Sequence, residues 1–430
     1  MGWLDWLLGK DEAPPAAGTA RAAKASDPSA APCTDTQGAT VVAGQGEHGA
    51  YDIDDAVLAG GGQAVLDFVL ADDLLEEVMH NGSDRPLVVF HRSHGMCDVN
   101  YRLEPHVVDR FIGRVAQRVG KVVDAQHPFL DGSLEDGSRV NASIPPFSGD
   151  WPNFTIRKFR KNVITVPELI RFGALSPEAA AFLWVAIEGL GRHAANVLVV
   201  GGTGSGKTTL LNALAWFAPR HHRIVLIEDT RELRVPHPNT LQMASGNGVT
   251  MNDLLVNALR QRPDRILVGE VRGPEAATLF TAMNTGHDGC MGTLHANSAR
   301  ESMMRITSSP MSVPLMQVNA LDLVVVQQRK QTDSGTRRFC SEITEVSGVG
   351  GDTARLNQLF AWNEFKKELS DTEVPSRLRT KICQAAGINA KQFNDILARR
   401  QAILSDLAKN KATPEDVAHA LQVESARPLR

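Results

Sequence analysis

The chain has 430 residues, of which 43% are hydrophobic and 22% are charged, and this predicts about three domain-sized units with packed cores. Its formal net charge of −4 at pH 7 argues against a dedicated nucleic-acid-binding protein, which usually carries a clearly basic domain. The five cysteines lie far apart and never in CxxC spacing, which argues against a disulfide framework or a four-cysteine zinc site and favours a reducing cytoplasm.

Residues 1–50 have the composition of a flexible N-terminal tether. A short apolar tip precedes a long stretch rich in alanine, proline, glycine, serine and threonine, which is typical of linkers. The tip is predicted either to stay disordered or dock on its own domain, or to act as a short interfacial anchor. No run approaches the roughly 18 apolar residues that cross a bilayer, so we expect membrane association to be peripheral or through a partner.

Residues 51–165 are predicted to form an α+β N-terminal domain. A helix-like run at 71–79, a turn at 81–84 and a strand-like run at 87–90 mix both patterns within a short distance. A domain of this kind is large enough to have a core of its own.

Two short helices are predicted to connect this domain to the next. Thr165 and Glu168 have the spacing of a capping box, in which the two side chains satisfy each other's backbone N–H groups. Ser176 followed by Pro177 places a capping residue before a proline at the first helical position. Both signals predict where a helix begins.

The strongest signal is a glycine-rich motif in a strand-to-helix context. An apolar run at 196–200 leads directly into GGTGSGKT, and a helical run at 210–217 follows, which is the context that a phosphate-binding loop (P-loop) requires. Its glycines let backbone N–H groups surround phosphates, its lysine reaches the β- and γ-phosphates, and its threonine hydroxyl binds Mg²⁺. The motif therefore predicts ATP and Mg²⁺ as ligands. The predicted binding residues are Gly201, Gly202, Thr203, Gly204, Ser205, Gly206, Lys207, Thr208 (also a Mg²⁺ ligand) and Thr209.

Further apolar runs at 223–227, 265–268 and 291–294 alternate with helical segments, a pattern that predicts a doubly wound α/β sheet. Ligands of such sheets lie at the carboxyl ends of the strands. The polar residues at these ends are Glu228, Asp229, Glu270 and His295. Nucleotide hydrolases place an acid near Mg²⁺ or its water at such a strand end, so Glu270 is predicted to organise Mg²⁺ partly through water.

Residues 351–430 are predicted to form a C-terminal helical subdomain. Their apolar residues recur at helical intervals, and Thr413 followed by Pro414 predicts a new helix start. Two interpretations stay open for this segment. It either packs on the preceding domain or provides a docking surface for a partner or a neighbouring subunit.

Four motifs follow one another in the chain: the P-loop and the segments at 227–232, 267–272 and 292–297. In this order they make the chain resemble the secretion-superfamily ATPases, which power type II and type IV secretion, type IV pili and archaella. Segments of the first domain at 134–141 and 155–159 look like the tight-adherence and conjugative branch, and those at 79–82 and 90–97 look most like archaeal relatives. The resemblance extends from near Leu70 to near Gly350. In that family these motifs are called the P-loop, the Asp box (227–232), the family's form of Walker B (267–272) and the His box (292–297).

The resemblance implies a RecA-like P-loop ATPase domain at 166–350. It also implies catalytic roles, with Glu232 polarising the attacking water, Glu270 acting as the Walker B acid and His295 sensing the γ-phosphate. The alternatives are a surface ion pair for Glu232 and a structural histidine for His295. For Glu228 and Asp229 a structural role competes with a chemical one.

Arginines of the N-terminal domain supply positive charge to the transition state in this family. Arg139 and Arg157 match such positions, and Arg160 matches less well; surface ion pairing is the alternative for all three. Hydrolases of this type need such charge, because phosphoryl transfer spreads negative charge over the phosphate oxygens.

The resemblance implies an ATP-hydrolysing homohexameric motor that powers assembly of a type IV pilus-like or archaellum filament, or of a secretion machine. Its expected partners are a polytopic membrane platform protein and, indirectly, pilin-like subunits, with no direct contact to nucleic acid. Its expected place is the cytoplasm, peripherally associated with the membrane through partners. The alternatives are a conjugative-type DNA or protein secretion ATPase and, from another class, a low-turnover ATP-binding scaffold.

Overall fold

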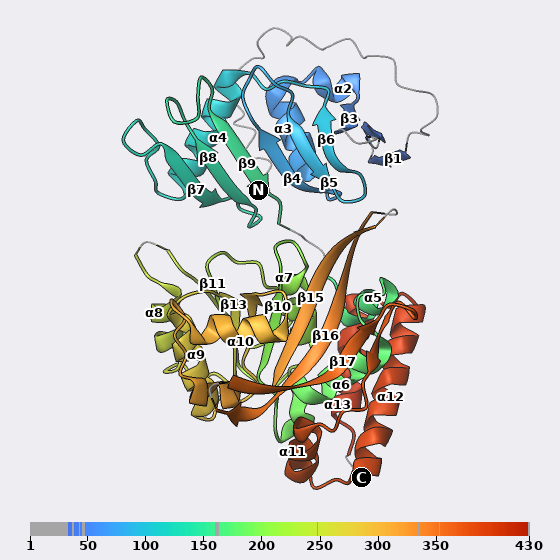
Figure 1. The fold of residues 1–430 in the computed structure, drawn as a ribbon. Coiled ribbons are helices and arrows are strands. Elements are labelled where there is room, and N and C mark those ends of the chain that lie inside the picture. Colours follow the sequence, from blue (N-terminus) through green and yellow to red (C-terminus); the bar gives the residue numbers. More distant parts are fainter. Residues whose placement is uncertain are drawn as a thin grey trace. The chain divides into compact units, whose positions relative to one another are not determined.

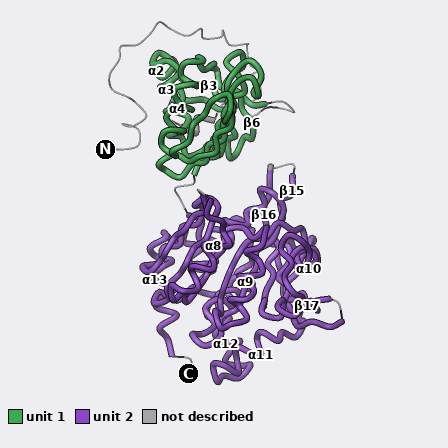
Figure 2. Tube along the Cα trace, turned by 90° about the vertical axis from the view of Figure 1, so that its left-hand side faces the viewer, with its two compact units in different colours: residues 1–162 green, residues 163–430 purple. Residues whose placement is uncertain are grey.

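The chain divides into two compact units, residues 1–162 and 163–430, each with its own sheet and core (Figures 1 and 2). No helix in the described part of the chain is long and apolar enough to cross a membrane. The computed structural model describes residues 33–36, 38–42, 44, 48–159, 163–246, 248–332, 335–351 and 353–428.

Unit 1 is built on a mostly antiparallel sheet of nine strands, in the order β1-β2-β3-β6-β5-β4-β9-β8-β7. The pair β3 and β6 is parallel. The strands are β1 (Cys33–Thr36), β2 (Ala39–Val42), β3 (Gly49–Ile53), β4 (Leu75–His80), β5 (Val88–His91), β6 (Gly95–Val99), β7 (Phe129–Ser133), β8 (Arg139–Ser143) and β9 (Asn153–Arg157). The helices are α2 (Asp55–Leu58), α3 (Gly61–Ala71) and α4 (Pro105–Arg118).

The core of unit 1 forms where α3 and α4 bury their apolar stripes in one cluster with the apolar side chains of the strands. In α4 the buried residues include Val108, Phe111, Ile112 and Val115, which recur three or four residues apart and so share one helix face. The ring of Phe111 lies 4.9 Å from that of Phe154 of β9. This packing gives the unit the α+β architecture that its sequence predicts.

Two segments of unit 1 differ from the sequence prediction. The stretch assigned to a tether contributes β1, β2 and the start of β3, because Ala39 and Val41 alternate with less buried neighbours and pack into the core. The first 32 residues, including the apolar tip, lie outside the described residues. The helix-like run at 71–79 instead contains most of β4, since pairing with β5 and β9 on both sides outweighs a short helical pattern.

Unit 2 has a sheet of nine strands in the order β12-β11-β13-β14-β10-β15-β16-β17-β18. The first six of these strands run parallel and the last three continue the sheet in antiparallel pairs. The strands are β10 (Val197–Gly201), β11 (Ile224–Glu228), β12 (Thr240–Ala244), β13 (Arg265–Val271), β14 (Met291–His295), β15 (Leu323–Thr332), β16 (Gly335–Gly350), β17 (Thr353–Asn363) and β18 (Glu368–Asp371).

Helices cover this second sheet, and β10 and β11 are buried along their whole length, as parallel strands between two helical layers are. The helices are α5 (Val166–Arg171), α6 (Pro177–Glu188), α7 (Lys207–Ala215), α8 (Met251–Ala258), α9 (Glu275–Asn284), α10 (Ala299–Thr307), α11 (Arg377–Ala386), α12 (Ala390–Lys409) and α13 (Pro414–Ser425), with the 3-10 turns η1 (Gly189–Gly191) and η2 (Leu315–Ala320). The architecture is mixed α/β, as predicted.

The two predicted helix starts are confirmed in α5 and α6, but both helices belong to unit 2 and do not connect the units. The backbone N–H of Thr165 donates to Oε2 of Glu168 at 2.9 Å, and that of Ala179 donates to Oγ of Ser176 at 3.3 Å. The sequence signals for the helix starts therefore correspond to hydrogen bonds that satisfy otherwise unpaired N–H groups.

The C-terminal part becomes helical later than the sequence predicts. Strands β17 and β18 follow residue 350 and extend the second sheet, because β16 is long enough to pair with β17 over most of its length. The helices begin only at Arg377. The predicted boundary at 350/351 thus lies between two adjacent strands of one sheet.

Helix α12 packs on α6 through apolar and ionic contacts. Phe393 and Leu404 belong to the same buried cluster as Trp184 of α6. The Arg400 guanidinium lies 4.5 Å from the Trp184 ring and forms an ion pair with Glu188, and both side chains of the pair are at least 95% buried. Burial lowers the pKa of Arg400, and the Glu188 carboxylate opposes that shift. These contacts favour packing as one role of the C-terminal helices.

Removing one member of this buried pair should destabilise unit 2 strongly. We expect Glu188→Gln to lower the free energy of unfolding by about 3–5 kcal/mol, because a buried guanidinium then lacks its counter-charge. Urea unfolding of the full chain measures this. The control is Glu364→Gln, which breaks an exposed pair with Lys330 and should change stability by less than about 1 kcal/mol. Equal stability of the two variants would contradict the assignment.

Candidate nucleotide-binding site

The glycine-rich motif forms a closed loop between β10 and α7. Gly204 and Gly206 have φ angles of 68° and 92°, in the left-handed region that favours glycine. Oγ of the buried Ser205 donates to the Gly202 carbonyl at 2.8 Å. A Cβ atom on Gly201 would lie 2.4 Å from the Gln327 carbonyl oxygen, so only glycine fits there. The loop can therefore present backbone N–H groups to a phosphate.

Helix α7 begins at Lys207, at the end of this loop. Lys207 Nζ donates to the Gly202 carbonyl at 2.9 Å, so the ammonium lies over the loop. Thr208 and Thr209 follow in the first helical turn and are half-buried. The N–H groups of a helix N-terminus and an ammonium together favour an anion.

The parallel strands β11, β13, β14 and β10 are neighbours in the sheet (Figure 1). Three polar residues lie at or next to the carboxyl ends of these strands. His295 ends β14 and is in register with Gly201 of β10. Its Nε2 lies 3.2 Å from Oγ1 of Thr203 in the loop. Glu228 ends β11, and Glu270 lies one residue before the end of β13. The structure thus brings His295 against the P-loop and places two carboxylates along the adjacent strand ends.

Glu270 is half-buried, and its carboxylate makes no hydrogen bond or ion pair with a described residue. The preceding Gly269 leaves room for a neighbour, because a Cβ there would lie 3.0 Å from Cγ of Glu228. Thr293 Oγ1 donates to the Gly269 carbonyl at 2.5 Å and fixes this part of β13. Close approach of Glu228 therefore accounts physically for glycine before the strand-end acid.

Glu228 organises the segment that carries Glu232. The buried Glu228 carboxylate accepts hydrogen bonds from the backbone N–H groups of Glu232 and Leu233, both at 2.8 Å, and from Gln242 Nε2 at 2.9 Å. Burial raises the pKa of Glu228. These contacts favour the structural role for Glu228, which holds the backbone at the predicted water-polarising residue.

Glu232 and Asp229 differ in their surroundings. The Glu232 side chain is half-buried and forms no ion pair with a described residue. Asp229 accepts a hydrogen bond from Ser245 Oγ at 2.7 Å and forms an ion pair with Arg272. Asp229 is therefore already neutralised, whereas the surface-pair alternative for Glu232 has no support within the described residues.

The predicted arginines of unit 1 are adjacent. Arg139 at the start of β8 is directly opposite Arg157 at the end of β9, so both side chains lie on one face of the sheet. Neither forms an ion pair with a described residue, although Glu77 of β4 is opposite Arg157 on its other side. Arg160 lies outside the described residues.

Two arginines near the P-loop were not among the predicted site residues. Nε of Arg338 in β16 donates to the Gly204 carbonyl at 2.8 Å. A Cβ atom on Gly204 would lie 3.1 Å from Nη1 of Arg329 in β15. One feature of the sequence could have pointed to them: two basic pairs, Arg329-Lys330 and Arg337-Arg338, lie on the two sides of a turn.

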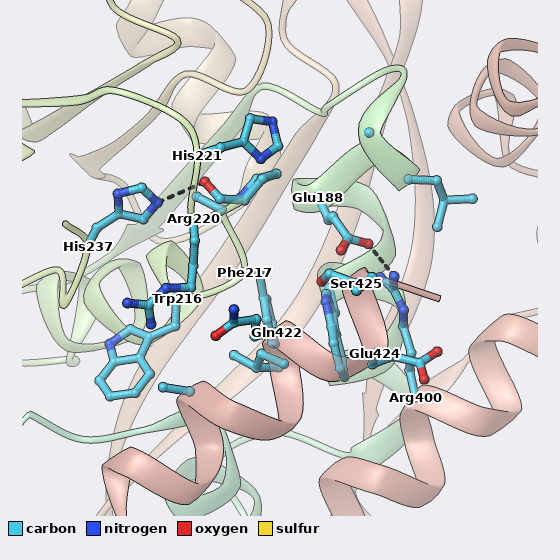
Figure 3. Close-up of a pocket in the computed structure, with 18 of the residues that line it drawn as sticks. Glu188, Trp216, Phe217, Arg220, His221, His237, Arg400, Gln422, Glu424 and Ser425 are labelled. Carbon is cyan, nitrogen blue, oxygen red and sulfur yellow. Dashed lines mark hydrogen bonds and ion pairs between the residues drawn. The ribbon is translucent and has the colours of Figure 1, made fainter. Parts of the chain in front are cut away.

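A cavity of about 400 Å³ lies elsewhere in unit 2, where the C-terminal helices meet the end of α6 and the segment after α7 (Figure 3). Its wall includes Trp216, His237 and Glu424, and the Glu188–Arg400 ion pair borders it. None of the predicted site residues lines it. It is therefore separate from the P-loop site.

A family model and several known proteins are similar to this chain. The family model described as type II/IV secretion system protein matches residues 61–415. Two proteins of Methanocaldococcus jannaschii are similar to this chain. MJ0781 is 51% identical over 236 residues, which are 53% of this chain and 33% of that protein. MJ0900 is 34% identical over 351 residues, which are 78% and 62% respectively. The chain thus spans less than two thirds of the length of either relative.

A bacterial relative and a solved structure extend the comparison. The probable conjugal transfer protein TrbB of Sinorhizobium fredii is 34% identical over 269 residues, which are 60% of this chain and 81% of that protein. The crystal structure of the pilus retraction motor PilT with bound ADP is 19% identical, with a TM-score of 0.48, and the match covers 83% of this chain and 95% of that one.

Proposed function

We propose, from the premise that this chain belongs to the type II/IV secretion system protein family, that it hydrolyses ATP to drive a filament-assembly or secretion machine. ATPases of this family hydrolyse ATP and assemble as hexamers. The observation that carries the proposal is the shared edge of the second sheet, which holds the P-loop, His295 and a Glu270 that has no partner among the described residues. Such an edge combines phosphate binding with a strand-end acid.

The residues at this edge fit ATP with Mg²⁺. The closed loop and the Lys207 ammonium hold the phosphates, and the Thr208 hydroxyl and the Glu270 carboxylate are oxygen ligands of the kind that Mg²⁺ prefers, directly or through water. When bound, Mg²⁺ neutralises charge on the β- and γ-phosphates. Glu270 would orient the waters around the phosphate chain.

The remaining steps are assigned to three kinds of residue. Glu232, whose backbone Glu228 fixes, would orient and polarise the attacking water. His295, which contacts Thr203 of the loop, would respond to the γ-phosphate. Arg139 and Arg157 would add positive charge from a neighbouring subunit, where phosphoryl transfer requires it.

The machine that uses this work is proposed to be a type IV pilus-like or archaellum filament, or a secretion apparatus. The protein would act in the cytoplasm and reach the membrane through a polytopic platform protein, with pilin-like subunits moved indirectly. A conjugative-type secretion ATPase is the second candidate, and the similarity to TrbB supports it. The net charge of −4 counts against direct binding of DNA.

The purified protein should release phosphate from ATP only with Mg²⁺ present. Chelating Mg²⁺ with EDTA should reduce the rate at least about tenfold, because the phosphate charge is then not neutralised. Added duplex DNA should leave the rate within about twofold. Absence of hydrolysis by a hexameric preparation would favour the scaffold alternative, and strong stimulation by DNA would favour the conjugative one.

A further inference from the structure

We infer that Arg329 and Arg338 form an arginine clamp that binds the phosphate chain of the nucleotide in the P-loop of their own subunit. The inference rests on the proposed function and adds two ligand-binding residues to it. Both side chains are exposed and come from the hairpin of β15 and β16, outside the four motifs that identify the site.

The sheet register places the clamp beside the loop. Strand β15 pairs with β10 up to Gln327, which is in register with Gly201. Strand β15 continues past this point, and Arg329 follows two residues later, where β10 has already turned into the loop. Successive side chains alternate between the faces of a strand, so Arg329 shares the face of Gln327. The hairpin therefore extends along the phosphate-binding loop.

Two contacts bring the clamp to the middle of the loop. Arg338 donates through Nε to the Gly204 carbonyl, which leaves its terminal nitrogens available. Nη1 of Arg329 would lie 3.1 Å from a Cβ atom on Gly204, and Cδ of Arg338 would lie 3.7 Å from one on Gly206. Both guanidinium groups thus approach the glycines that form the phosphate cradle.

The clamp concentrates positive charge without a protein counter-charge. Arg329 and Arg338 are directly opposite each other in the hairpin, an arrangement in which like charges repel. Neither forms an ion pair with a described residue. Arg338 also lies beside Gly206, the residue before α7, and a helix N-terminus is itself positive. An anion at this place would relieve the repulsion.

The adjacent basic pair of the same hairpin differs from the clamp because it has protein partners. Lys330 and Arg337 are also opposite each other, but on the other face of the hairpin. Lys330 pairs with Glu364 at 3.4 Å, and the Arg337 guanidinium lies 4.8 Å from the Trp362 ring. This second pair is already occupied by protein partners. Among the described residues of the hairpin, Arg329 and Arg338 are the pair without such partners, so they can bind a ligand.

The ligand chemistry is that of a di- or triphosphate chain. Guanidinium groups bind phosphate oxygens through paired N–H donors, and two of them can contact successive phosphates. A free polyphosphate shares this chemistry with ADP and ATP. Adenosine lacks it, so a comparison of the three separates phosphate recognition from contacts to the base or the ribose.

The test measures binding of a fluorescent ADP analogue to the full chain, with variants Arg329→Gln, Arg338→Gln and the double variant. We expect each single change to weaken binding about tenfold and the double change to weaken it further, because each removes charge-assisted hydrogen bonds. Arg337→Gln is the matched control and should stay within about twofold. Arg338→Lys should recover part of the loss, since it retains the charge.

Tripolyphosphate and adenosine, used as competitors and titrated directly by calorimetry, give the second readout. Tripolyphosphate should bind the double variant at least about tenfold more weakly than the wild type, whereas adenosine should bind both equally. Salt should weaken ADP binding to the wild type more than to the double variant. A purely structural role of Arg338 would lower the melting temperature without changing this salt dependence.

The outcomes separate the two proposals. If the folded double variant binds ADP and tripolyphosphate as tightly as the wild type, the clamp proposal is wrong. The proposal of ATP hydrolysis is not affected by that result. An equal loss in Arg337→Gln would also overturn it, because the effect would then belong to the hairpin as a whole. Tripolyphosphate binding that depends on both arginines, in a protein without ATPase activity, would retain the clamp and contradict the proposed function instead.

Discussion

Glu270→Gln should bind ATP within about threefold of the wild-type affinity and hydrolyse it about 10²–10³-fold more slowly. The substitution keeps the size of a half-buried side chain and removes only its negative charge. That charge is expected to organise Mg²⁺ and its waters, whereas the loop and Lys207 hold the phosphates. Binding of a fluorescent ATP analogue and steady-state phosphate release measure the two effects separately.

The control for this prediction is Glu364→Gln, which neutralises an exposed carboxylate paired with Lys330 and should leave both quantities unchanged. Lys207→Ala gives the complementary pattern, because it removes the ammonium charge that attracts the phosphates and should therefore weaken ATP binding itself. Hydrolysis by Glu270→Gln at the wild-type rate would contradict the assignment of Glu270 as the strand-end acid.

The sequence predicts the P-loop region well because its signals are local. The apolar run before the motif and the helical run after it correspond to β10 and α7. The meeting of His295 with the loop is also predictable, since the carboxyl ends of parallel strands share one edge. Family resemblance adds the role of each residue but not its contacts.

The features that the sequence does not reveal depend on pairing between distant segments. Arg329 and Arg338 reach Gly204 only because β15 pairs with β10 and then continues past it. Glu228 holds the backbone of Glu232 through hydrogen bonds that no motif encodes. The residues after 350 form strands because the second edge of β16 is available for pairing with β17. The composition of the segment alone does not reveal that partner.

Arg139 tests whether the catalytic site is shared between subunits. We expect Arg139→Ala to hydrolyse ATP at least about 10³-fold more slowly than the wild type, as loss of an arginine that contacts the transition state does. The adjacent Arg157 does not replace it if both guanidinium groups are needed for the spread charge. Arg85→Ala, which changes an exposed arginine of the same unit, is the control and should be near wild type.

Mixing two inactive variants then distinguishes a trans arginine from one that acts within its own subunit. Arg139→Ala retains the P-loop and Lys207→Ala retains the arginine, so a mixed ring contains some complete sites if the arginine reaches a neighbour. In an equal random mixture about a quarter of the interfaces are complete. Partial recovery toward that fraction is the expected result, and a strictly concerted ring would give less.

Subunit exchange has to be verified for this test, by co-purification of an untagged variant with a tagged one. If exchange occurs, no activity returns and Arg139→Ala alone is close to wild type, the shared-site proposal fails. Arg139 would then be an exposed-face residue beside Arg157 with no part in catalysis. Recovery has no such alternative, because neither variant can complete its own site and only an interface between them combines the intact loop with the intact arginine.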